Sequence, residues 1–345
     1  MKKQQIENVE ASGLETKIIQ ILMSTYNGEE YLREQIESII QQDCEEKTGT
    51  KIKLFIRDDG SKDRTQMIIK VYAAKYPETI QWYQGKNIGV IKSFFELIEK
   101  SDDNATYYAF ADQDDYWHKD KLSAGIKHID KMSEERDTKK NIPLLYCCSP
   151  LLVDEELKEL NNEMTRKAKK PAFENAVVEN IVTGCTIVMN KTLRNMVKAY
   201  QPDFTVMHDW WFYLLASCYG KVYYDIEQHI SYRQHGTNTV GYNTSKIKEL
   251  RDRLKRFKGN RQNITKQLSE LISIHKLYVK ENPKSSVLRS KEVKQKMDIA
   301  IGLVKYSSKL RYLPERVRIL RKSGIFRQRK VDNIIFKLIL LSGSY

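Results

Sequence analysis

Short apolar runs and segments with helical spacing alternate along the chain from residue 17 to residue 149. Apolar runs at 18–25, 51–59, 80–84 and 107–111 predict buried strands. The segments between them place apolar residues three or four positions apart, which predicts one buried helix face in each. This alternation predicts an α/β domain built on a parallel sheet that is covered by helices.

Local signals suggest where two of these helices begin. Glu29 and Glu30 precede an apolar face, in a first turn where the helix dipole favours anions. Asp63 and Gln66 have capping-box spacing, which predicts a helix that begins at Asp63, and Pro77 ends it.

The pattern changes twice further along the chain. Apolar runs at 144–149, 181–189 and 222–226 mix less regularly with a helix expected at 210–218, and we expect the acceptor side of the same domain here. Beyond residue 242 the sequence favours helices and has no convincing strand. We therefore expect three parts: a polar extension at 1–16, a main domain at 17–242, and a basic helical region at 243–345.

The net charge of +14 is concentrated at the end of the chain. Residues 246–345 hold 27 Lys and Arg against 8 Asp and Glu, a net charge of +19, which leaves −5 for residues 1–245. This split predicts chemistry in the first part and attachment to a polyanion in the second. The segment 316–341 interleaves cations with Ile, Leu and Phe, which is typical of an amphipathic element in a lipid headgroup layer. Because no nucleic-acid module is recognisable, we expect an anionic membrane and no nucleic acid as the partner.

Composition and the cysteines suggest a compartment. The chain is 41% hydrophobic and 30% charged, as in globular proteins, and has no apolar run of the ~18 residues that a spanning helix needs. Its polar first residues lack the apolar segment of an export signal. Five cysteines, an odd number without zinc spacing, predict neither a disulfide framework nor a structural zinc site. We expect a cytoplasmic protein, peripheral on the inner face of the cell membrane.

Polar clusters follow three of the expected strands, at 24–27, 57–61 and 112–115. Ligands of open α/β sheets bind outside the carboxyl ends of the strands, so these clusters predict one crevice. The chain lacks both common glycine-rich phosphate loops, and aspartates repel a diphosphate. A divalent cation, Mg²⁺ or Mn²⁺, resolves this repulsion. Asp112 and Asp114 are two positions apart at a strand end, which favours side chains on one side of the chain.

Six motifs in order resemble a known family over residues 17–241. The GT-A glycosyltransferases of family 2 are similar in STYNG at 24–28, RDDGS at 57–61, KNIGV at 86–90 and ADQDDYW at 111–117. Bacterial rhamnosyltransferases of cell-wall rhamnan and O-antigen synthesis are similar in MHDWW at 207–211 and YRQHGTNTVG at 232–241. The resemblance implies a GT-A domain at 17–242. It also implies inverting transfer of a sugar, with dTDP-β-L-rhamnose as the expected donor, to a hydroxyl of a lipid-linked saccharide.

The resemblance also implies residue roles. Either Asp58 or Asp59 would hydrogen-bond the pyrimidine base, and Asp112 would lie on the ribose side. Asp209 would be the catalytic base, with Trp210 and Trp211 on the acceptor side. Asp114 and His235 would hold the metal ion. The nucleotide sugar would be bound by Thr25, Tyr26, Asn27, Glu29, Asp58, Asp59, Lys86, Asn87, Asp112 and Gln113.

Each of these residues also has an ordinary structural explanation. Asp112 and Asp114 could belong to a solvated loop, and the aspartates before Gly60 to a common turn. A carboxylate at Asp209 suits proton abstraction at neutral pH, but it could equally be a helix cap. His235 could be a plain surface histidine. Arg233 could be either a phosphate clamp or a salt-bridge partner.

Two alternatives to rhamnosyl transfer remain at this point. One is a family 2 enzyme that uses a UDP-hexose. The other is a non-catalytic carbohydrate- or nucleic-acid-binding module, against which the intact set of aspartates and His235 argues. The sequence leaves a homo-oligomer open.

Overall fold

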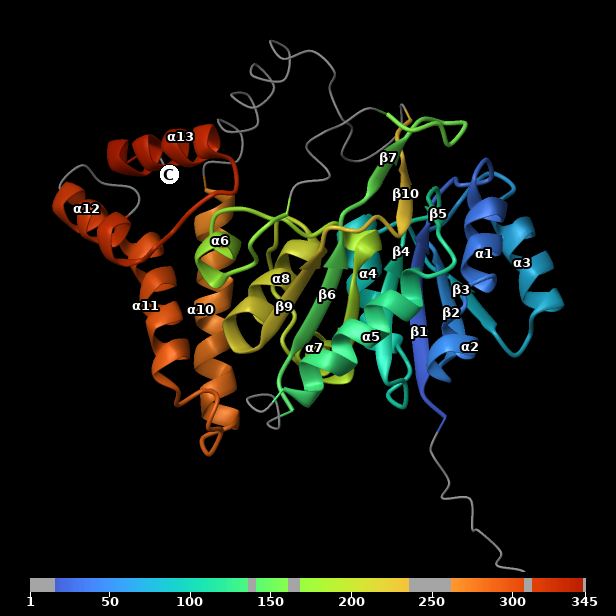
Figure 1. The fold of residues 1–345 in the computed structure, drawn as a ribbon, viewed down its shortest axis with the longest axis horizontal. Helices are drawn as coiled ribbons and strands as arrows, with labels where there is room; N and C mark the ends of the chain where they lie inside the picture. Colours follow the sequence, from blue (N-terminus) through green and yellow to red (C-terminus); the bar gives the residue numbers. More distant parts are fainter. Residues whose placement is uncertain (1–15, 136–140, 161–167, 236–261, 307–311, 344–345) are drawn as a thin grey trace, which may run out of the picture.

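A seven-stranded mixed sheet forms the centre of the protein (Figure 1). The computed structural model describes residues 16–135, 141–160, 168–235, 262–306 and 312–343. In spatial order the strands are β3 (Ile80–Gln84), β2 (Lys51–Asp58), β1 (Ile18–Thr25), β4 (Tyr107–Ala111), β8 (Val188–Asn190), β6 (Leu144–Cys148) and β9 (Lys221–Asp225). β8 runs antiparallel to both of its neighbours, and the other neighbouring strands are parallel. The carboxyl ends of β1, β2, β4, β6 and β9 therefore share one edge.

A small three-stranded sheet lies at that edge. It consists of β5 (Tyr116–Trp117), β10 (Ile230–Arg233) and β7 (Leu151–Val153), with β10 in the middle. In Figure 1, β7 and β10 extend beyond the end of the central sheet. β10 thereby brings residues near 233 back over the loop that follows β4.

Helices cover both faces of the central sheet and bury separate apolar clusters. Along β1, Ile21 and Met23 belong to one cluster and Leu22 to the other, as alternation along an extended strand requires. The first face carries α1 (Leu32–Ile40), α2 (Cys44–Thr48), α3 (Thr65–Lys75) and α5 (Lys121–Glu134). The second face carries α4 (Val90–Lys100), α6 (Phe173–Ala176), α7 (Lys191–Ala199) and α8 (His208–Tyr219).

The strands and helices expected up to residue 149 are present, with one local correction. α3 begins at Thr65 and not at Asp63, and no side chain caps it in the expected way. Asp63 Oδ1 instead accepts from the Thr65 N–H at 3.0 Å, and the Gln66 amide donates to Asp58 at 2.9 Å. The capping box is wrong because Asp58, brought close by β2, competes for the Gln66 side chain.

The expected strand at 181–189 is also largely wrong. Gly184–Thr186 forms a 3₁₀ turn, and β8 begins only at Val188. This turn matters for the site, because it carries the backbone past the end of β4.

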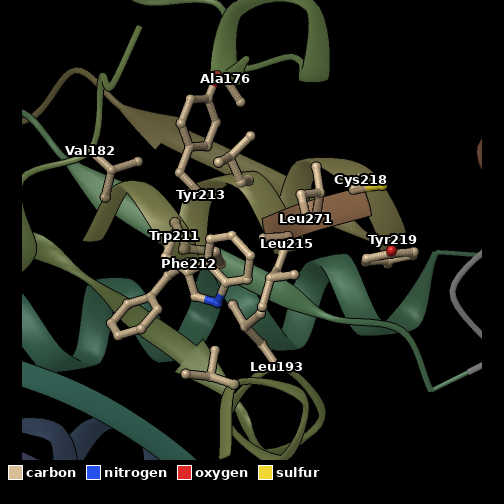
Figure 2. Packing of buried hydrophobic residues seen from close by; sticks show 14 of the residues in the cluster. Ala176, Val182, Leu193, Trp211, Phe212, Tyr213, Leu215, Cys218, Tyr219 and Leu271 are labelled. Atoms are coloured by element: carbon tan, nitrogen blue, oxygen red, sulfur yellow. The ribbon is translucent and has the colours of Figure 1, made fainter. Parts of the chain in front are cut away.

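Within the described residues, the basic C-terminal part is helical, as expected, and contains α10 (Asn263–Glu281), α11 (Lys291–Tyr306), α12 (Leu313–Lys322) and α13 (Lys330–Ser342). The amphipathic segment expected at 316–341 is two helices, separated at Gly324, whose φ is +67°. Residues of α10 and α11 belong to the same buried cluster as those of α8, and Figure 2 shows Leu271 of α10 among the α8 side chains. The boundary expected at 242 lies outside the described residues. None of the helices in the described ranges has the length and apolar character to cross a bilayer.

Candidate active site

The loops after β1, β2 and β4 are bonded to one another at the shared edge of the sheet. The Gln113 amide accepts from the Tyr26 N–H at 2.8 Å and donates to the Tyr26 carbonyl at 3.1 Å. Asn27, at φ +48°, donates its N–H to Ser61 Oγ at 2.9 Å and accepts from the Lys62 N–H at 2.9 Å. The three polar clusters of the sequence therefore lie in one place.

Gln113 thus acts as a brace between two loops. A Cβ on Gly28 would overlap the Gln113 amide, so a larger residue at position 28 would require this amide to move from its place between the loops. Glu29 is similarly engaged: its carboxylate accepts from the Arg64 N–H at 2.8 Å, at the start of α3. Tyr26 is 43% exposed and has surface to offer a ligand.

Asp58 and Asp59 are both buried but make different contacts. Asp59 pairs with the Arg57 guanidinium at 2.5 Å and accepts from the N–H groups of Ile88 and Gly89 at 2.8 and 2.9 Å. It therefore fixes the loop that carries Lys86 and Asn87, whose side chains are exposed.

Asp58 accepts hydrogen bonds mainly from side chains that can reorient. Its carboxylate accepts from Ser61, through both N–H and hydroxyl, from the Gln66 amide and from the Thr25 hydroxyl at 3.4 Å. Hydroxyls can rotate toward other acceptors, whereas the charged and backbone donors around Asp59 are fixed. Asp58 is therefore the better placed of the two to exchange a partner for a ligand.

The acidic loop after β4 gathers several ligand atoms in a small space. One oxygen each of Asp112 and Asp115 and the Cys185 sulfur lie within 4.8 Å of one another. Asp115 is buried and accepts from the Arg233 N–H at 3.2 Å. Burial, followed by the charges of Asp114 and Asp209, raises the pKa of Asp112 to about 7. A cation would relieve this repulsion.

Asp114 meets His235 across 121 residues of sequence, with Nε2 2.7 Å from Oδ2. A carboxylate and an imidazole are ligands that suit a divalent cation such as Mn²⁺. Asp114 and His235 therefore fit the metal that the resemblance implies, whereas Asp112 lies with Asp115 and Cys185. The His235 ring also lies 5.1 Å from that of Tyr31, which fixes it from the other side.

Arg233 is a salt-bridge partner in this structure. Its guanidinium is almost fully buried, pairs with Glu34, donates to the Asp114 carbonyl at 2.9 Å and lies 4.5 Å from the Tyr31 ring centre. These contacts hold the end of β10 against the acidic loop. The choice that the sequence left open is therefore resolved in favour of positioning.

Asp209 lies in the first turn of α8, beside this cluster. Met207 occupies the N-cap position, so Asp209 is not the cap. Its Oδ1 accepts from the Trp210 N–H at 2.7 Å and from the Asn180 amide at 3.1 Å. Burial nevertheless raises the pKa of Asp209 to about 7, which suits a group that gains and loses a proton near neutral pH.

The two tryptophans after Asp209 differ in exposure. Trp210 is partly exposed, and its indole N–H donates to the Ala176 carbonyl at 2.7 Å. Trp211 has no exposed surface and packs among the core residues of Figure 2. The expectation that Trp211 lines the acceptor side is wrong, because α8 turns it toward the core.

Sequence reasoning missed three participants. Asp115 belongs to the acidic cluster at 112–115, but only its tertiary contacts distinguish its environment from that of Asp114. Cys185 lies in no motif that indicates a site, yet its sulfur lies within 4.8 Å of carboxylate oxygens of Asp112 and Asp115. Asn180 carries no motif, and only the fold brings it to Asp209.

Comparisons with known proteins agree with this geometry. A family model described as Glycosyl transferase family 2 matches residues 20–134. The chain is 32% identical over 255 residues to dTDP-rhamnosyl transferase RfbG of Shigella flexneri, covering 71% of this chain and 82% of that protein. Crystalline S. aureus TarS 1–349 in complex with UDP-GlcNAc has a TM-score of 0.52 at 16% identity, covering 94% of this chain and 90% of that one.

A second solved structure, GalNAc-T7 with UDP, GalNAc and Mn²⁺, has a TM-score of 0.54 at 10% identity, covering 83% of this chain and 56% of that one. These two neighbours show the GT-A fold, and the Shigella relative shows the family. Together with the converging loops and the acidic cluster, these similarities show that the chain belongs to glycosyltransferase family 2.

Proposed function

We propose that the protein is a metal-dependent, inverting rhamnosyltransferase of cell-surface polysaccharide synthesis. It moves L-rhamnose from dTDP-β-L-rhamnose to a hydroxyl of a lipid-linked saccharide. The observation that carries this proposal is the Asp114–His235 pair beside the buried carboxylate of Asp209. The relative named as a dTDP-rhamnosyl transferase supports the choice of donor.

The nucleotide half of the donor would lie across the three braced loops. Asp58 would accept from the imino N–H of the pyrimidine, with Thr25, Tyr26, Asn27 and Glu29 around the nucleoside. Lys86, Asn87, Asp112 and Gln113 would complete its surroundings. Asp59 serves this binding indirectly, since it holds the 85–89 loop in place.

Asp114 and His235 would hold a divalent cation against the diphosphate. When bound, the cation supplies positive charge that stabilises the leaving diphosphate. Arg233 keeps the acidic loop in position from behind, through its bond to the Asp114 carbonyl.

Asp209 would take the proton from the acceptor hydroxyl. Inversion requires attack from the face opposite the leaving diphosphate, with the base close to the attacking oxygen. Asn180 and the Trp210 N–H orient the carboxylate for this step. Trp210, which is partly exposed, would lie on the acceptor side.

Donor choice is tested by thermal unfolding with dTDP, UDP or GDP in the presence of Mn²⁺. A ligand at 100 times its Kd adds ~2.7 kcal/mol to the free energy of unfolding, which raises Tm by several degrees. We expect dTDP to stabilise most, and dTDP-rhamnose to be consumed in a transfer assay that EDTA stops. A larger shift with UDP, together with turnover of a UDP-hexose, would indicate the alternative donor class. Absence of any nucleotide effect and of turnover would indicate a binding module.

We also propose that the C-terminal helices place the enzyme on the inner face of the cell membrane. On α13, Val331, Ile334 and Leu338 are 60–66% exposed and recur at the spacing of one helix face. On α12, Arg318, Arg321 and Lys322 are exposed. An apolar face beside cations suits an anionic bilayer surface, where each Lys or Arg contributes ~1 kcal/mol.

Reversal of Arg318, Arg321 and Lys322 to Glu should reduce binding to anionic liposomes by ~100-fold or more, because three favourable charges become repulsive. Sedimentation with vesicles of phosphatidylglycerol measures this. A matched variant reverses Lys62, Lys70 and Lys75, which lie at the other end of the sheet, and should bind as wild type does. Equal losses in the two variants would mean that net charge and not this surface governs binding.

A further inference from the structure

A hollow lies at the far edge of the sheet, apart from the residues proposed to bind the donor. It has a volume of about 550 Å³, within the range of small-molecule sites. Residues of α5 and of the segment that follows β9 line it, with Lys127, His128, Tyr223, Ile226 and Glu227 among them. None of these residues has a role in the proposed transfer.

Tyr223 is the central feature of this hollow. Its ring stacks on His128 with centres 4.1 Å apart and planes 18° apart, and it lies beside Tyr146 of the neighbouring strand at an interplanar angle of 11°. Tyr146 is anchored in turn by its hydroxyl, which donates to Asp225 at 3.0 Å. Despite these contacts Tyr223 keeps 39% of its surface exposed. The protein thus presents a rigid, supported aromatic ring to solvent.

The same tyrosine lines a neighbouring hollow of about 460 Å³, between the end of α5 and helices α8 and α11. Tyr223 therefore lies where two hollows meet along β9, the last strand of the sheet. An elongated ligand could therefore extend from one hollow into the other past the exposed part of this ring.

The charges of the first hollow exclude several occupants. Lys47 and Lys127 are offset by Asp120, Asp225 and Glu227, so its wall favours neither a polyanion nor a polycation. An aromatic ring among many hydrogen-bonding groups of both signs suits a neutral chain of hydroxyl groups with apolar C–H faces.

The position of the hollow also suits such a chain. His229 of the hollow and His235 of the proposed metal site are six residues apart, so at most ~20 Å of chain separates them. They are joined by β10, which runs from one to the other. A single sugar would not span this distance, but several linked sugars would.

We infer that the hollow at Tyr223 is a binding subsite for the distal sugars of the saccharide acceptor. The inference rests on the proposed function, because it takes the acceptor to be a glycan. A second copy of the chain could instead pair with the edge of β9. Lys221, which begins this strand and pairs with Glu135 at 2.7 Å, is the kind of charged residue that protects an edge from such pairing.

The test is the affinity of the protein for rhamno-oligosaccharides of one to eight residues, measured by titration calorimetry. Wild type should bind the long oligosaccharides more tightly than the short ones. Tyr223→Ala should lose three- to tenfold of the affinity for the long ones, the range expected for one aromatic contact, while Tyr223→Phe should keep it. Val71→Ala, which removes an exposed apolar side chain on α3, is the matched control.

Donor turnover separates this inference from the proposed function. Tyr223→Ala should consume dTDP-rhamnose with a monosaccharide acceptor at the wild-type rate, because the transfer residues are untouched. If wild type binds all lengths equally, or binds none of them, the subsite is absent whether or not transfer occurs. If Tyr223→Ala instead converts a dimer to a monomer in light scattering, the hollow is a protein interface and the inference is wrong.

Discussion

Asp209→Asn should lower kcat by ~10²- to 10⁴-fold while leaving the affinity for the donor nucleotide unchanged. The amide keeps the oxygen that accepts from Asn180 and the Trp210 N–H, so the local geometry should survive. It cannot take a proton from the acceptor. Initial rates and nucleotide titrations on the same preparation measure both quantities, and a parallel loss of affinity would indicate a structural role.

The pH dependence offers a second readout for the same residue. Because burial raises the pKa of Asp209 to about 7, wild-type transfer should fall as pH drops through 7 and the base becomes protonated. The folded state also binds this proton more tightly than the unfolded state, so the ionised carboxylate lowers stability above its ordinary pKa of ~3.9.

Asp209→Asn should therefore unfold at a higher temperature than wild type at pH 8, with a difference that shrinks toward pH 4. Asp203→Asn removes the same charge from an exposed position nearby and should change neither rate nor Tm. Equal Tm values for Asp209→Asn and wild type at pH 8 would contradict a buried, costly charge.

Asp114→Ala should abolish transfer. Loss of a metal ligand's hydrogen-bond partner already costs ~10- to 100-fold, and loss of the ligand itself costs more. Asp114 is held on two sides, by His235 through its carboxylate and by Arg233 through its carbonyl, so the loop should keep its course without the side chain.

Calorimetric titration of Mn²⁺ in the presence of dTDP measures the lost cation affinity directly. The matched variant is Asp203→Ala, which should retain both Mn²⁺ binding and turnover. Full activity of Asp114→Ala, or of wild type in excess EDTA, would show that the reaction does not depend on this cation.

The first four strands of the chain, and the longer helix between each pair of them, could be predicted from local pattern alone. Each strand is an apolar run of the right length, and each helix shows one apolar face, because burial on a sheet imposes these periods directly on the sequence. The meeting of the three polar loops was predictable for the same reason, since the polar residues that follow parallel strands must lie at one edge.

Two predictions were wrong because contacts from elsewhere in the fold outweigh a local signal. The capping box at Asp63 and Gln66 has correct spacing, yet Gln66 donates to Asp58, which only β2 brings within reach. Trp211 stands in a motif beside the base, yet the direction of α8 against the core buries it.

By itself, the sequence determined which kinds of side chain lie at this edge of the sheet. The tertiary structure decided which partners each of them contacts, and so which role each can have. Asp58 and Asp59 are chemically identical neighbours, and they differ only because Arg57 and the 85–89 loop engage one of them. Asp114 and His235 are 121 residues apart, and β10 makes them neighbours. The local pattern indicates which strand, helix or loop a residue belongs to. Its hydrogen-bond partners, burial and pKa depend on contacts between segments that only the folded chain brings together.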